Sequence, residues 1–329
     1  MLKLFQRNMV VQTALILAAL LLLWMRPLIT PPVMENTPHT GLLYDLLCQW
    51  LSGVPRLAVI LAMITVLAEG VWLNLLLVSV GLASQNNLLP TLLYVILMSA
   101  GATTLTPAVL VCGIAIGGLG QLLLRGTLLT IPSSKICGTT LLIGLASLFY
   151  LPATALLLSY LLIAVNYRLY GWKDWAVLLL GFAAPYLTVI LVLYMVDGLA
   201  PWWASLGQGF AFTGLHNSHL TTLQAIGISA LALLVVWCLL TTASQIGERP
   251  VMWQKNATTV LLFTLGGLLM LFYAPLSGES LSLFAIPFAF CGARFFAVAT
   301  QPTGFRAKKR RLWIYDLLFL LTLIAALVC

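Results

Sequence analysis

Residues 56–81 read RLAVILAMITVLAEGVWLNLLLVSVG, and the only charges in this stretch are Arg56 at its start and Glu69 near its middle. About 20 apolar residues in an α-helix cross the hydrocarbon core of a bilayer. The stretch is long enough for that, and similar runs recur along almost the whole chain. It therefore predicts a membrane-spanning helix and, with its counterparts, an all-α fold.

Composition supports the same conclusion. The 329 residues are 62% hydrophobic and 7% charged, whereas about 25% of the residues in a soluble domain are charged. A water-soluble fold could not cover its surface with so few polar side chains. We expect a polytopic transmembrane helical bundle of about 11 helices, some short or broken, in a single domain over residues 1–329.

Three features interrupt the series of long spans. Residues 41–52 carry apolar side chains on one helical face and polar ones on the other, which predicts an amphipathic helix in the membrane interface. Helix-poor residues and Pro107 predict a break at 101–107, and Pro152 divides residues 136–167 into two short helices. Residues 196–220 are the longest polar connection and predict a loop. The other expected spans are residues 10–29, 89–100, 175–195, 221–243, 257–273, 281–296 and 312–328, with one more from the break to residue 124.

Lys and Arg residues predict the orientation of the chain. If the spans alternate from a cytoplasmic N-terminus, thirteen of the 16 basic residues fall on cytoplasmic segments and the C-terminus is periplasmic. Cytoplasmic loops are enriched in Lys and Arg, so this bias favours that direction. The net charge of +8 then reflects orientation and not binding to nucleic acid. Membrane lipid is the partner that we expect, and no motif identifies a protein partner.

The predicted outer face holds the titratable chemistry. Glu35, His39 and Asp45 lie in the first outer loop. The second outer loop carries a further set of candidate substrate contacts, which are Asp197, Trp202, His216 and His219. The titratable groups among them are candidates for acid–base catalysis around one cavity. The alternative for each is an ordinary polar residue of a solvated loop.

A metal site is conceivable at one place only. His216 and His219 are three residues apart, so their imidazoles could converge on a divalent metal from one helical face. No third ligand is specified by the spacing. We therefore expect no metal and no other cofactor.

Other polar residues lie within the predicted spans. Glu69 is either a proton or cation relay or a carboxyl that is hydrogen-bonded to a neighbouring helix, because charges inside a membrane are costly. Arg294 and Asp316 lie at similar depth and predict an ion pair. Tryptophans at the span ends predict an interfacial belt, and they are Trp24, Trp50, Trp202, Trp203, Trp253 and Trp313.

One stretch carries a family resemblance. The text ICGTTLLIGLASLFYLPATALLLSYLLIAVNYR from Ile136, followed by WKDWAVLLLGFAAPY, resembles an uncharacterised family of polytopic inner-membrane proteins of Bacteroidetes-type bacteria. That resemblance implies a bacterial inner membrane and no established activity.

The layout is also similar to the GT-C class of membrane glycosyltransferases, which use polyprenyl-phosphate-linked sugars on the outer face. The shared points are the cytoplasmic N-terminus, the outer loop with an interfacial helix and carboxylates, and the Tyr-Leu-Pro turn. This similarity implies Asp45 or Glu35 as the catalytic carboxylate, with Arg26, Arg56 or His39 at the lipid phosphate.

Three functions are therefore in competition. The first is a GT-C-like transferase, or a degenerate relative, in envelope glycan assembly. The second is a transporter or flippase with a midplane site near Glu69. The third is a non-catalytic membrane subunit that docks a partner.

Overall fold

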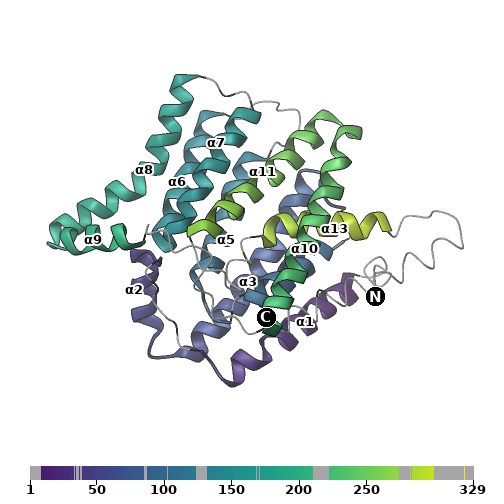
Figure 1. Ribbon diagram of the computed structural model, residues 1–329, viewed down its shortest axis with the longest axis horizontal. Helices are drawn as coiled ribbons and strands as arrows, with labels where there is room; N and C mark the ends of the chain where they lie inside the picture. The colour runs from purple at the N-terminus through teal and green to yellow at the C-terminus, as the bar shows by residue number, and fades with distance from the viewer. Residues whose placement is uncertain are drawn as a thin grey trace, which may run out of the picture.

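The protein is an all-α helical bundle (Figure 1). The computed structural model describes residues 9–32, 34, 37, 39–84, 87–101, 103–123, 132–167, 169, 171–209, 222–273, 282, 284–299 and 322. Within these ranges no β-strand forms, and one isolated bridge joins Thr40 to Tyr150. The predicted fold class is confirmed.

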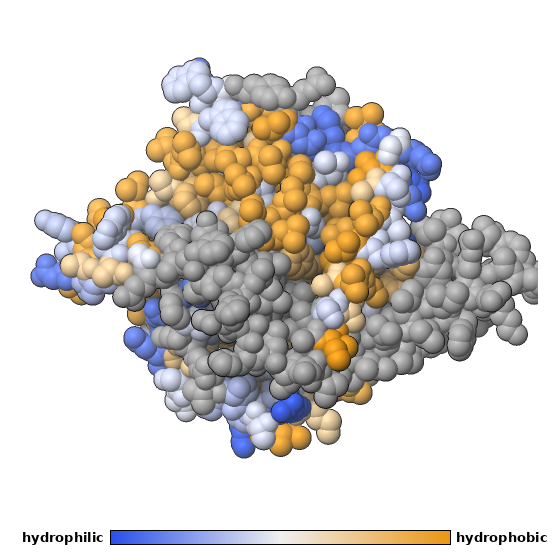
Figure 2. Space-filling view, in the orientation of Figure 1, coloured by the Kyte–Doolittle hydropathy of each residue, from blue (hydrophilic) through white to orange (hydrophobic). Residues whose placement is uncertain are grey.

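In the described part of the chain, four helical segments are long and apolar enough to cross a membrane. They are α1 (Met9–Ile29), α3 (Pro55–Ser79), α8 (Trp172–Met195) and, within the helical stretch after residue 221, Ser229–Glu248. Their exposed residues are mostly large and hydrophobic, which suits contact with lipid and not with water. These helices indicate a membrane-associated protein. Figure 2 shows the result: hydrophobic residues cover much of the visible face, and hydrophilic ones gather at the upper right and along the left and lower edges.

Several shorter helices, together with α10 and α11 of 23 residues each, make up the rest of the fold. The remaining elements are α2 (Leu42–Leu51), α4 (Leu89–Gly101), α5 (Pro107–Leu122), α6 (Ser133–Phe149), η2 (Leu151–Ala155), α7 (Leu156–Asn166), α9 (Leu199–Gly209), α10 (Thr222–Ser244), η3 (Ile246–Glu248), α11 (Val251–Tyr273) and α13 (Ala285–Ala299). Helix α4 is buried on every side from Leu89 to Met98 and packs against α1, α3 and α13. A helix that is hydrophobic all round is expected in such a central position.

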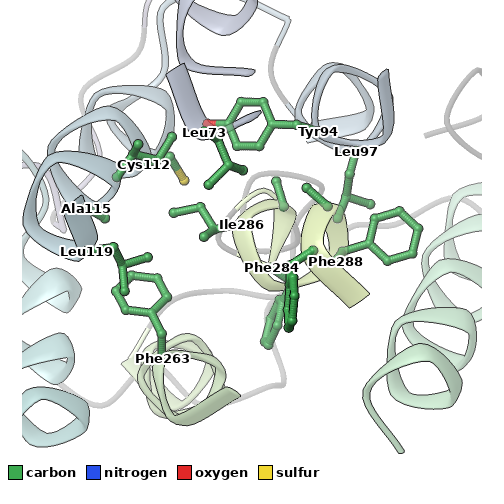
Figure 3. Close-up of a cluster of buried hydrophobic side chains, with 14 of the residues drawn as sticks. Leu73, Tyr94, Leu97, Cys112, Ala115, Leu119, Phe263, Phe284, Ile286 and Phe288 are labelled. Carbon is green, nitrogen blue, oxygen red and sulfur yellow. The ribbon is translucent and has the colours of Figure 1, made fainter. Parts of the chain in front are cut away.

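The core lies where α3, α4, α5, α11 and α13 meet. Figure 3 shows side chains from these helices packed together: Leu73, Leu119 and Phe263 lie around the central space that Ile286 enters, and Phe288 lies beside Leu97. Leu73, Leu97, Leu119 and Phe288 are no more than 1% exposed. This close packing holds the short helices in place although several could not cross a bilayer on their own.

Most predicted helix breaks are confirmed. Helix α4 ends at Gly101 and α5 begins at Pro107. The stretch at 136–167 divides at Tyr150, with the 3₁₀ turn η2 between α6 and α7. Proline fixes φ and lacks the N–H that a helix interior needs, so both breaks fall at Pro107 and Pro152. The predicted amphipathic helix at 41–52 forms α2, close to its predicted bounds.

Three expectations are wrong. The connection at 196–220 is not a loop throughout, because α9 occupies Leu199–Gly209 with Pro201 in its first turn, a position that proline tolerates. Helix α11 begins at Val251, before the predicted start at residue 257. Its first turns are polar, so hydropathy did not include them in the predicted span. Trp24 is not in an interfacial belt: it is 1% exposed, and its Nε1–H donates to Ser99 Oγ at 2.8 Å. The last predicted span, at 312–328, lies outside the described residues except for Thr322.

The connections gather at two ends of the bundle. At one end, the segment before α2, the α6–η2 turn and the α8–α9 turn surround one cavity. At the other end, the α3–α4 turn, the residue after η3 and α13 surround a second cavity. In Figure 1, α2 and α9 lie at the left and the α10–α11 turn at the upper right. The alternating spans predict that the first set of connections lies on the outer side and the second set on the cytoplasmic side. The structure separates the connections into the same two sets. Which end faces the cytoplasm stays a prediction.

Candidate functional site

The site is built on a backbone clamp between the first predicted outer loop and the α6–η2 turn. Gly41 N–H donates to Phe149 O at 2.9 Å, and Leu151 N–H donates to His39 O at 3.0 Å. A Cβ at Gly41 would overlap the carbonyl group of Leu148. Only glycine permits this approach, because neither backbone can move aside without breaking the two hydrogen bonds.

A cavity of about 370 Å³ opens beside the clamp, and we call it the carboxylate cavity. One wall comes from Thr37, Thr40 and the first turns of α2 with Asp45. The α6–η2 turn contributes Leu148 and Leu151. The remaining wall comes from α8 and α9, and it includes Leu193, Gly198, Pro201, Trp202, Ser205 and Leu206. The cavity therefore combines hydroxyls and one carboxyl group with apolar walls, as is typical of sites for small amphiphiles.

Asp45 is the only ionisable side chain in the described lining of this cavity. Thr40 Oγ1–H donates to Asp45 Oδ1 at 3.0 Å and also lies 2.7 Å from Thr37 O. Partial burial raises the pKa of the Asp45 carboxyl above its usual value, and the hydrogen bond from Thr40 offsets part of this rise. A carboxyl group whose pKa is moved toward neutrality is suited to accept a proton from a substrate hydroxyl.

His39 and Trp202 complete the connection between the two predicted outer loops. His39 is 4% exposed, and its Nδ1 lies 3.0 Å from Gly209 O at the end of α9. A carbonyl oxygen can only accept, so Nδ1 carries the proton in this contact. Trp202 is 7% exposed and lines the cavity, so it serves as a wall and not as part of an interfacial belt. Trp50 and Trp203, by contrast, are exposed as belt residues should be.

The other predicted site residues are not brought together in the described part of the chain. Arg26 and Arg56 are exposed and do not line the carboxylate cavity. Asp197 is exposed at the α8–α9 turn, where its φ of 55° is the left-handed conformation that closes the turn. Glu35, His216 and His219 lie outside the described residues, so the metal prediction at the two histidines stays a prediction.

Glu69 lies apart from this cavity, in the interior of the bundle. The Tyr94 hydroxyl on α4 donates to Glu69 Oε2 at 2.8 Å, and Glu69 is 8% exposed. A Cβ at Gly113 on α5 would overlap Glu69 Oε1, so the carboxyl group fills the space that this glycine leaves. Of the two expectations for Glu69, the hydrogen bond to a neighbouring helix is observed.

Several site residues were not anticipated. Thr40 and Ser205 line the carboxylate cavity, but an isolated hydroxyl residue carries no distinctive sequence pattern. Trp253 lies under two arginines, Arg249 and Arg294, that are far apart in the sequence.

No protein-family model, curated protein or solved structure matches the chain. The resemblances to the inner-membrane family and to the GT-C class therefore stay predictions, and function has to be argued from the residues of the site.

Proposed function

We propose that the protein is a transferase of the bacterial inner membrane that acts on a polyprenyl-phosphate-linked sugar at the outer face, in the manner of GT-C enzymes. The observation that carries the proposal is the carboxylate cavity at the end of an apolar bundle, with Asp45 in its wall. The apolar lining at Leu148 and Leu193 suits a lipid-linked substrate, and the hydroxyls of Thr40 and Ser205 suit a sugar.

Asp45 is the proposed general base. An acceptor hydroxyl in the cavity would transfer its proton to the Asp45 carboxylate while its oxygen attacks the anomeric carbon of the sugar. The bond between that carbon and the phosphate oxygen breaks, and polyprenyl phosphate leaves with the bonding electrons. The raised pKa of Asp45 favours this proton transfer, because burial makes the carboxylate a stronger base than an exposed aspartate.

The phosphate of the donor fits best outside the cavity. No Lys or Arg belongs to the described lining, and the charge of Asp45 would repel a phosphate there. Arg26, in the last turn of α1, and Arg56, in the first turn of α3, are the basic residues of the predicted outer side in the described chain. In this proposal they supply positive charge for the donor phosphate on that side, although neither arginine lines the cavity.

The test is the envelope glycan profile of cells that carry Asp45→Asn. General-base catalysis contributes about 10²- to 10⁴-fold to a rate, so the glycan product should fall by at least about 100-fold. Asp174→Asn, in the first turn of α8 near the opposite end, is the carboxylate control and should leave the product unchanged. Equal amounts of folded protein in the membrane must be verified for both variants. A normal glycan profile with Asp45→Asn would remove the proposal.

A transporter is the second candidate, and Glu69 is the observation that favours it. A buried carboxyl group in the middle of a spanning helix is costly and often marks an ion pathway. The hydrogen bond from the Tyr94 hydroxyl also explains, without a transport role, why a carboxyl group at Glu69 is tolerated in the interior. Uptake into proteoliposomes that is lost with Glu69→Gln, while the glycan profile is normal, would favour the transporter over the transferase.

A further inference from the structure

The end of the bundle opposite Asp45 holds a second polar cavity, of about 160 Å³, which we call the arginine cavity. Arg249, which follows η3, and Arg294, on α13, both line it. Ser84 and Asn87 of the α3–α4 turn add polar groups, and Leu77 and Phe290 add apolar ones. Three parts of the chain that are distant in sequence thus converge on one space.

Both guanidinium groups lie close to the ring of Trp253 on α11. The Arg294 Cζ lies 4.2 Å from the centroid of the Trp253 ring, and the Arg249 Cζ lies 6.0 Å from it. A cation over an aromatic face is stabilised by attraction to the electrons of the ring. That contact positions the guanidinium groups, but it uses none of the N–H donors in the plane of either group.

These N–H donors are poorly satisfied. Arg294 Nε is buried and makes no hydrogen bond within the described residues. Within the described residues, the guanidinium makes one hydrogen bond, from Arg294 Nη2 to Gln245 Oε1, and at 3.5 Å it is long. In the described ranges no carboxylate forms an ion pair with Arg249 or Arg294, and Asp316, the partner expected for Arg294, lies outside them. Two adjacent cations with free donors create a strong preference for an anion.

We propose that the arginine cavity binds the phosphate group of an anionic ligand. The planar guanidinium groups match phosphate oxygens in a bidentate manner, which a point charge such as Lys does not. Asn87 Oδ1 accepts from Leu89 N–H at 3.0 Å, so its amide NH₂ remains a donor. The apolar residues Leu77 and Phe290 suit the start of an acyl chain, so the phosphate can belong to a lipid headgroup or to a soluble phosphate ester. The inference concerns the other end of the bundle and does not depend on the proposed transferase.

The experiment measures binding to the purified full-length chain in a non-ionic detergent by native mass spectrometry and thermal shift. The probes are a short-chain phosphatidic acid, the corresponding diacylglycerol, which lacks only the phosphate, and inorganic phosphate. Hydrogen bonds to charged groups are worth about 1.5–3 kcal/mol, so losing one arginine should weaken the affinity for phosphatidic acid at least about tenfold.

Three variants make the result interpretable. Arg249→Gln removes an exposed side chain and should leave the fold intact. Arg294→Lys keeps the charge but loses the planar fork. Lys173→Gln removes a basic residue from the exposed first turn of α8 and is the charge-matched control.

Two results would support the proposal, and they distinguish the source of the phosphate. Saturable binding of phosphatidic acid, without a thermal shift from inorganic phosphate, identifies a lipid headgroup. A shift from inorganic phosphate as well, lost in both arginine variants, identifies a soluble phosphate ligand. The proposal is overturned if phosphatidic acid and diacylglycerol bind alike, or if both arginine variants bind phosphatidic acid as tightly as Lys173→Gln does.

Discussion

The backbone clamp at Gly41 permits the most direct test of how the carboxylate cavity is held. Gly41→Ala places a Cβ against the carbonyl of Leu148, which is backbone and cannot rotate away. We expect the loop to detach from the α6–η2 turn, and the hydrogen bonds Gly41 N–H to Phe149 O and Leu151 N–H to His39 O to break. Each is worth about 1 kcal/mol net, so the docked state loses about 2 kcal/mol.

Hydrogen exchange of the protein in nanodiscs measures this loss. About 1.4 kcal/mol corresponds to a factor of ten, so 2 kcal/mol makes the opening equilibrium about 30-fold more favourable. Under conditions in which the exchange rate is set by the opening equilibrium of the loop, the amides of residues 41 and 151 should exchange faster by that factor. Gly53→Ala is the matched control at the other end of α2, because a Cβ there meets nothing within 4 Å. Equal exchange rates in the two variants would refute the clamp.

Two further predictions concern the two carboxyl groups. Thr40→Ala removes the hydrogen bond that lowers the pKa of Asp45, so the pKa should rise further. Because Asp45 must be deprotonated to act as a base, the acidic limb of a pH–rate profile should move to higher pH. An unmoved limb would show that Thr40 does not tune the pKa of Asp45. Tyr94→Phe leaves Glu69 without its donor and should lower the free energy of unfolding in detergent by about 1–3 kcal/mol, whereas Glu69→Gln keeps an acceptor and should cost less; the reverse order would contradict the hydrogen bond from Tyr94.

The helices could be predicted from the sequence because their signals are local. A bilayer-length apolar run such as residues 56–81 predicts α3 nearly to its bounds, and Pro107 and Pro152 predict the breaks. Helix α9 was missed because Asp197 and the histidines made the connection look polar, although the apolar residues around Trp202 suit a helix. Local hydropathy depends on composition alone, and the composition of a short interfacial helix differs little from that of a loop.

The contacts between distant segments could be predicted only in part. The order of the spans placed His39, Asp45 and Trp202 at the same end, and the structure brings their segments together. Hydropathy could not show that Trp24 faces inward to Ser99, since a residue at a span end can face lipid or a neighbouring helix. The close approach at Gly41 depends on a partner more than 100 residues away, so no local pattern reveals it.

Labelling of single cysteines from outside intact cells tests the central claim most directly. In a variant without the native cysteines, Ser205→Cys lies in the carboxylate cavity and Gly247→Cys at the opposite end, in η3. A thiol reagent that cannot cross membranes should label residue 205 in intact cells and residue 247 only after the cells are broken. Labelling of residue 247 but not residue 205 in intact cells would place Asp45 on the cytoplasmic side and contradict an outer-face site.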